Sequence, residues 1–161
     1  MWLYNGKYIK DNISWVDTNN VRHPPNWGAL WSDADKEAAG MVKASDPEKP
    51  SDIFYKNISR NADGSWASTE LDIADLKTNY VASTKRRAHH KLADNDWQEI
   101  AKLARSRAID SDVATYRAAV LTACETIEGK INACSSLADF KKLFVVPSGG
   151  KAPIYDWPDE L

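Results

Sequence analysis

The chain has 161 residues, enough for one medium domain or two small ones, and a formal net charge of −2 at pH 7. With 21 basic side chains against 23 acidic ones, it lacks the overall positive field of a typical nucleic-acid-binding protein. No apolar run approaches the roughly 20 residues of a membrane span, and the first residues do not form a secretory signal peptide.

The first 71 residues carry the pattern of short antiparallel strands joined by tight turns. Asn5-Gly6 is a preferred central pair for a type I′ turn, because both of its central residues take positive φ. Polar turn sequences separate two further pairs of segments. The three expected strand pairs are residues 2–4 with 8–9, 13–16 with 21–23, and 53–59 with 65–69.

One short helix is expected within this β unit. Ser32 is suited to cap it, Asp35 completes a capping box three positions on, and Gly40 is suited to end it. We therefore expect a helix over residues 33–39. Residues 41–50 are polar and contain proline, so we expect a loop there.

A helical period begins at Asp72 and is clearest from Asp110 to Cys134. Apolar residues in this stretch recur every three or four positions and so share one face of a helix, which must be buried. They are Val113, Tyr116, Val120, Cys124, Ile127, Ile131 and Cys134. This stripe is expected to organise the second half of the chain.

Three further helices are expected around the long one. They span residues 72–92, 96–107 and 137–144. Asp72, Asp96 and Ser136 are suited to cap them. The second of these helices has an apolar face that we expect to pack inward, formed by Trp97, Ile100, Leu103 and Ala104.

These patterns predict an α+β protein in three parts. Residues 1–71 form a Trp-rich antiparallel β unit with one short helix, and residues 72–146 form a three- to four-helix bundle. Residues 147–161, rich in proline, glycine and acidic side chains, form an extended tail.

The sequence contains no recognisable catalytic, cofactor-binding or metal-binding constellation. His89 and His90 are adjacent, so on a helix they point about 100° apart and do not chelate one ion. Cys124 and Cys134, ten residues apart on one helix, are about 15 Å apart, too far for a disulfide. We expect both cysteines to be buried thiols in a protein that is not secreted. We also expect the protein not to be an enzyme and to need no cofactor or metal.

The densest basic run is Lys85-Arg86-Arg87. It lacks the interleaved aromatic residues of a nucleic-acid site. A solvated helix face or an acidic protein partner is the better interpretation.

Tryptophan is unusually abundant, with seven residues in the chain. Three interpretations stay open: the core of a unit with little aliphatic material, a protein interface, or a platform for stacking glycans. We favour the core for most of these rings. The aromatic residues that are candidates for partner contact are Trp2, Tyr4, Trp15, Trp27, Trp31, Tyr155 and Trp157.

Two segments resemble proteins of bacteriophage tails. The sequence Val-Arg-His-Pro-Pro-Asn-Trp at 21–27, followed by Trp31-Ser32 and a short acidic segment ending at Gly40, resembles a segment of phage tail-associated proteins. The second half resembles the C-terminal helical region of tail-fibre assembly and tail structural proteins. The residues that carry this second resemblance are Leu92, Asp94 to Trp97, Arg105, Arg107 and Tyr116-Arg117.

The resemblance implies a non-enzymatic virion structural protein of the phage tail, assembled in the host cytoplasm. Its expected partners are other tail or tail-fibre subunits and further copies of itself in a homo-oligomer, with no nucleic acid and no membrane. One alternative is a tail-fibre assembly chaperone that is not retained in the virion. Another is a glycan-binding module that uses the N-terminal Trp and Tyr residues. Arg117 is expected to pair with Asp94 or Asp96 and so lock two helices together.

Overall fold

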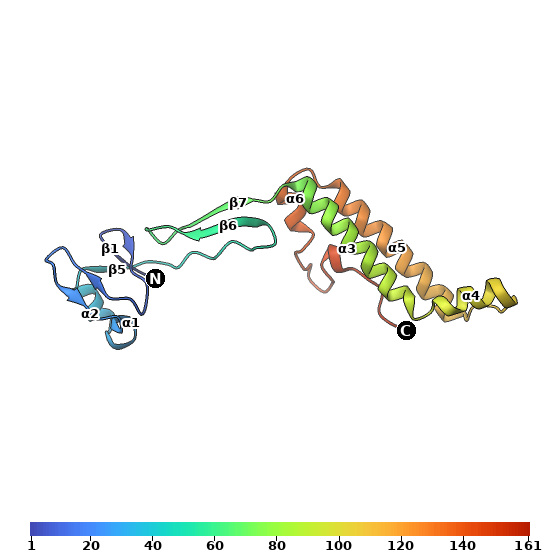
Figure 1. The fold of residues 1–161 in the computed structure, drawn as a ribbon, viewed down its shortest axis with the longest axis horizontal. Coiled ribbons are helices and arrows are strands. Elements are labelled where there is room, and N and C mark those ends of the chain that lie inside the picture. The colour runs from blue at the N-terminus through green and yellow to red at the C-terminus, as the bar shows by residue number, and fades with distance from the viewer. The chain divides into compact units, whose positions relative to one another are not determined.

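A computed structural model describes all 161 residues, and the chain divides into two compact units, Met1–Glu70 and Leu71–Leu161. The first unit contains small antiparallel sheets and the second contains the long helices (Figure 1). The α+β class expected from the sequence is confirmed.

The first unit has seven short strands in three antiparallel sheets. The strands are β1 (Trp2–Tyr4), β2 (Lys7–Tyr8), β3 (Trp15–Val16), β4 (Arg22–His23), β5 (Met41–Lys43), β6 (Tyr55–Arg60) and β7 (Trp66–Glu70). They pair in the orders β2-β1-β5, β3-β4 and β6-β7. The first turn is as expected, because Asn5 and Gly6 have φ of 48° and 71°.

The expected loop over residues 41–50 instead begins with a strand. β5 pairs with β1 so that Val42 lies opposite Leu3, and the Ala44 N–H donates to the Met1 carbonyl at 3.0 Å. Met41 is buried. A strand of three residues is too short to show an alternating pattern in the sequence. Its hydrogen bonds are made with β1, about forty residues earlier in the chain.

Two short helices complete this unit, α1 (Trp27–Leu30) and α2 (Asp33–Ala38). The capping box of α2 is confirmed: Ser32 Oγ accepts from the Asp35 N–H, and Asp35 Oδ2 accepts from the Ser32 N–H at 2.9 Å. Gly40 follows with φ of 81°.

The core of the first unit is built from rings. Trp27 is completely enclosed, and its indole N–H donates to the Ile13 carbonyl at 3.3 Å. Trp15 and Met41 are the other buried members of this cluster. Partly buried side chains pack around them, namely Trp2, Tyr4, Ile9 and Trp31.

Arg60 makes one of the contacts between the β6–β7 hairpin and the rest of this unit. The guanidinium carbon lies 4.2 Å from the centre of the Tyr8 ring and 5.1 Å from that of Trp66, and the group is also paired with Asp46. Cation–π contacts of this kind stabilise by about 1 kcal/mol.

Helices α3 (Ile73–Ala93) and α5 (Ser111–Ala133) lie side by side and antiparallel in the second unit (Figure 1). In the chain, α4 (Asp96–Arg105) follows α3 and precedes α5. In space, it extends beyond the end of the α3–α5 pair. After α5 come α6 (Leu137–Lys142) and a 3₁₀ turn, η1 (Pro153–Tyr155).

The apolar stripe of α5 is confirmed as the core of this unit. Val113 is partly exposed and the other six expected residues are buried. Leu76 and Ala88 of α3 are buried beside the stripe, and Phe140 of α6 is enclosed with its ring centre 5.2 Å from that of Tyr80.

The C-terminal segment mostly lacks regular structure, as expected, but it packs against the helices. Ala152, Ile154 and Trp157 are buried, η1 contacts α5, and the Ile154 N–H donates to the Leu143 carbonyl at 3.1 Å. Two long helices cover only part of one another's apolar stripes, so these side chains cover part of the remainder. Residues 147–161 therefore belong to the second unit rather than forming a separate tail.

Candidate functional site

The aromatic residues expected to contact partners have two different positions in the first unit. Trp15 and Trp27 are buried, whereas Trp2, Tyr4 and Trp31 are partly exposed at the edge of the same cluster. A buried ring reaches a partner only if the core opens. This corrects the assignment of Trp15 and Trp27 as contact residues, and their role is structural.

Polar groups fix the orientation of this aromatic cluster. Trp15 stacks on His23, and their ring centres are 4.2 Å apart. The centre of the Tyr4 ring lies 4.7 Å from that of Trp15, and the two ring planes are tilted. His23 Nε2 lies 3.2 Å from Asp17 Oδ2. The pKa of the Asp17 carboxyl is below its ordinary value, chiefly because the Val21 N–H donates to it and further because of His23.

The two C-terminal aromatic candidates also differ in exposure. Trp157 is 6% exposed and belongs to the core of the second unit, whereas Tyr155 is 45% exposed. The Arg87 guanidinium lies 5.3 Å from the centre of the Tyr155 ring. Of this pair, only Tyr155 is open to a partner.

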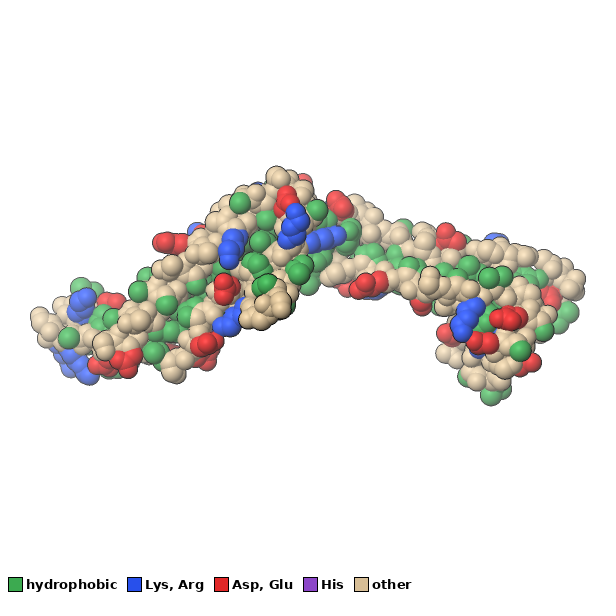
Figure 2. All heavy atoms as spheres, turned by 180° about the vertical axis from the view of Figure 1, so that it is seen from behind, with side chains coloured by type: hydrophobic (Ala, Val, Ile, Leu, Met, Phe, Trp, Pro, Cys, Tyr) green, Lys and Arg blue, Asp and Glu red, His purple; other side chains and the backbone are tan.

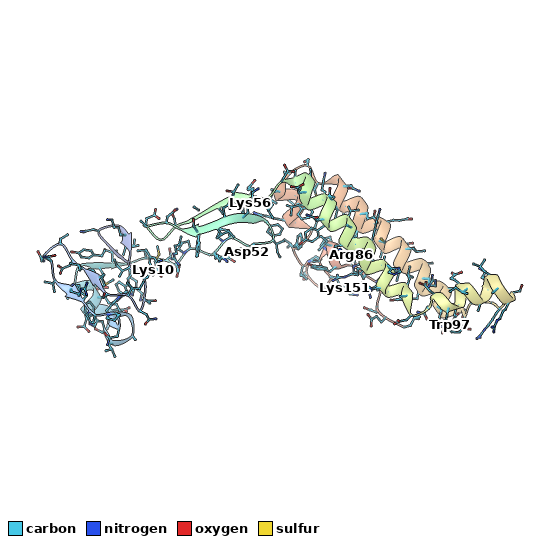
Figure 3. The ribbon with its side chains drawn as sticks, viewed as in Figure 1. Lys10, Asp52, Lys56, Arg86, Trp97 and Lys151 are labelled. Carbon is cyan, nitrogen blue, oxygen red and sulfur yellow. The ribbon has the colours of Figure 1, made fainter.

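The largest departure from expectation is the face of α4 that was expected to pack inward. Trp97 is 50% exposed, Ile100 65% and Leu103 86%, and Ala104 is exposed as well. Trp97 lies on the arm that α4 forms (Figure 3). In the view from behind, that arm is at the left, with apolar side chains visible among charged ones (Figure 2). The apolar face of α4 therefore points to solvent.

Polar contacts hold the opposite side of α4 in place. Gln98 is buried, its amide nitrogen donates to Asp110 Oδ2 at 2.8 Å, and its amide oxygen accepts from the Asp110 N–H at 2.9 Å. A buried amide whose donor and acceptor are both satisfied fixes the rotation of the helix. The apolar face is thus turned outward by a specific polar contact.

Arg117 of α5 provides the second attachment of α4. Its Nη1 donates to the Leu92 carbonyl at 3.0 Å and lies 2.9 Å from Asp96 Oδ1, while its Nε lies 3.4 Å from Glu99 Oε1. The expected pair of Arg117 with Asp96 is confirmed. One guanidinium joins the end of α3, the start of α4 and the first turns of α5, as its planar set of donors permits.

The ends of α4 carry opposite charges. Asp96 and Glu99 lie in its first turn, and Lys102 and Arg105 in its last. This arrangement complements the helix dipole. The exposed apolar face therefore lies between an acidic end and a basic end, as in a helix that docks in one orientation.

The start of α5 is too polar to cover the apolar face of α4, and the sequence already shows this polarity. Residues 110–112 are Asp-Ser-Asp, and Val113 is the only large apolar residue in the first turn of α5. The helical period reveals that an apolar face exists but does not reveal what covers it.

A second feature is an open cleft of about 1210 Å³ between α3 and the C-terminal segment. Arg86 of α3 and Lys151 of the C-terminal segment lie on the same side of α3 (Figure 3). The cationic side chains that line the cleft are Arg86, Arg87, Lys91 and Lys151, with His90 beside them. Asp94, Asp159 and Glu160 line it as well.

The two cysteine thiols are not activated as nucleophiles. Burial and the neighbouring Glu128 carboxylate raise the pKa of the Cys124 thiol to about 11, and burial raises that of Cys134. No group of three or more His, Cys, Asp or Glu side chains is placed to hold a metal ion. None of the helices has the length and apolar character that a membrane span requires.

The two candidate surfaces are the exposed apolar face of α4 and the open cleft beside α3. No protein-family model, curated protein sequence or solved structure matches the chain.

Proposed function

We propose that this protein is a non-enzymatic component of a bacteriophage tail that binds other tail or tail-fibre subunits. The outward apolar face of α4 is the observation that carries the binding role. The resemblance of two sequence segments to phage tail proteins supports the setting.

The α4 face has the features of a helix that docks into a groove. Trp97, Ile100 and Leu103 follow one another at three-residue steps along one side of the helix. Covering a large apolar side chain stabilises a complex by about 2 kcal/mol. Because Gln98 and Arg117 fix the helix from behind, little conformational entropy is lost when a partner covers it.

The motif residues behind the resemblance have structural roles that are compatible with this proposal. Trp27, which ends the proline-containing segment, fills the core of the first unit. Asp96 and Arg117 hold α4 against α5. Both motifs build a scaffold that presents a surface, and neither brings reactive groups together.

Locating the protein during phage assembly tests the proposal. Purified particles of the phage that carries the gene, and tail intermediates from infected cells, are probed with an antibody against this chain. Presence in finished tails supports a virion subunit, and presence in intermediates alone supports the chaperone. Absence from both contradicts the proposal.

A pair of variants tests the α4 face itself. Ile100→Asp combined with Leu103→Asp places two charges on the exposed face, so the fold should survive while tail association is lost. Leu121→Asp is the control, because Leu121 is an exposed apolar residue of α5 and not of α4. Light scattering of the same proteins tests the expected homo-oligomer. Equal association of all variants would show that α4 is not the contact.

The choice between subunit and chaperone now rests on that experiment alone. The aromatic residues that favoured a retained subunit include Trp15, Trp27 and Trp157, and all three are buried. For the glycan-binding alternative, burial removes Trp15 and Trp27 as stacking surfaces and leaves the partly exposed Trp2, Tyr4 and Trp31.

A further inference from the structure

We propose that the cleft between the second half of α3 and residues 151–161 binds a short, extended, acidic segment of a partner protein. This inference rests on the proposed binding function but uses a surface distinct from α4.

The cleft has the dimensions of a peptide site. It follows α3 from Ser83 to the C-cap residue Asp94, eleven residue steps that rise about 17 Å along the helix axis. About five residues of extended chain span that length. A single phosphate or carboxylate group would occupy only a fraction of it.

The basic side chains of α3 leave positive charge in the cleft unpaired. Lys91 lies 3.4 Å from Glu160, and Lys151 lies 2.7 Å from Asp159, so these two cations have carboxylate partners. The ion pairs of α3 are made by Lys85 and Lys91, and Arg86 makes none.

Arg87 interacts with the Tyr155 ring and not with an acid. Arg87 is four residues from Lys91, and like charges at this spacing destabilise a helix. An incoming carboxylate would relieve this repulsion.

An acidic segment of the chain itself already packs beside the cleft. Its own sequence Asp-Trp-Pro-Asp-Glu at residues 156–160 lacks helix and strand, buries Trp157 and pairs Glu160 with Lys91. The internal segment shows that this side of α3 accepts a chain with carboxylate and aromatic side chains. The partner segment would lie parallel to it along Arg86 and Arg87.

The acidic side chains of the cleft argue against nucleic acid as the occupant. Asp94, Asp159 and Glu160 line the same cleft. A nucleic acid places a charged phosphate at every nucleotide and would be repelled by these carboxylates. The carboxylates of an acidic peptide, hexaglutamate included, are carried on flexible side chains that can turn toward the arginines and away from these three acids, whereas the phosphates of a nucleic acid lie in its backbone.

Fluorescence polarisation with labelled hexaglutamate tests the inference on the full chain. Hexaglutamate should bind saturably, and neutral hexaglutamine should bind much more weakly. Arg86→Ala should weaken hexaglutamate binding about tenfold, since it removes one charge-assisted contact, and Arg86→Lys should restore part of it.

Lys85→Ala is the matched control. Lys85 is the neighbouring cation, but it lies on another side of α3, beside Asn132 and 3.4 Å from Glu128. This variant should change hexaglutamate binding less than about twofold, provided that its thermal melting matches that of the wild type.

Three results would overturn the inference. These are no saturable binding of hexaglutamate, an equal loss in the Lys85 and Arg86 variants, and tighter binding of a six-nucleotide oligothymidylate than of hexaglutamate. The α4 double variant should bind hexaglutamate normally. A failure of the tail proposal is therefore distinguishable from a failure of this one.

Discussion

Cys124 lies on the buried face of α5, and its thiol donates to Glu128 Oε1 at 3.2 Å. Burial is the main cause that raises its pKa to about 11, and the carboxylate adds to it. At pH 8 the thiolate fraction should be about a hundredfold below that of a cysteine with an ordinary pKa.

We therefore expect iodoacetamide to modify Cys124 slowly at pH 8 in the folded protein and rapidly in urea. Peptide mass spectrometry over a time course measures both rates. Equal rates in the two conditions would mean that the stripe around Cys124 opens readily.

The sequence predicts a contact between two side chains well where their charges alone identify the partners. Arg117 sits at the edge of an apolar stripe, where its stem is buried and its charge needs a carboxylate. The pair with Asp96 was expected on those grounds and is present. Glu99 and the Leu92 carbonyl were not expected as additional partners, because their positions depend on how the chain turns between α3 and α4.

The tryptophans mark the limit of prediction at this scale. Composition alone left core, interface and glycan platform open. What decides between them at Trp15 and Trp27 is enclosure by distant segments, including the Met41 side chain at the start of β5. The sequence contains no local signal for that enclosure.

Most elements whose signals are local were predicted closely, although Asp96, expected as a cap, lies in the first turn of α4 and Asn95 is the N-cap. The capping contacts at Ser32 and Ser136 join residues three positions apart, so both partners lie within one short motif. The Asn5-Gly6 turn is equally local. Strand β5 and the orientation of α4 depend on distant partners, and both were predicted incorrectly.

The stripe of α5 is the element on which the second unit depends. Ile127 is 1% exposed in its middle, whereas Leu121 on the same helix is 52% exposed. Ile127→Asp would bury an unpaired charge and should destabilise the unit by more than about 4 kcal/mol. Leu121→Asp should leave its stability within about 0.5 kcal/mol.

Urea denaturation followed by far-ultraviolet circular dichroism compares these two variants directly. Similar midpoints for both would mean that the stripe is not the core.

At the scale of the whole molecule, the two units have cores of very different size. The first unit buries three apolar residues and the second buries thirteen. A unit of 70 residues with so small a core is expected to be marginally stable. The C-terminal segment adds buried apolar residues to the second unit. Its proline and glycine content had led to the prediction of an extended tail.

The two units should therefore unfold in separate steps, the first unit at the lower temperature. Near-ultraviolet circular dichroism is expected to report the first step, because five of the seven tryptophans lie in residues 1–70. Far-ultraviolet circular dichroism should report the later loss of α3 and α5. In the Ile127→Asp variant the helical signal should be lost while the tryptophan transition of the first unit stays at its wild-type temperature. A single shared transition, or loss of both signals in that variant, would show instead that the stability of the Trp27 cluster depends on the helices.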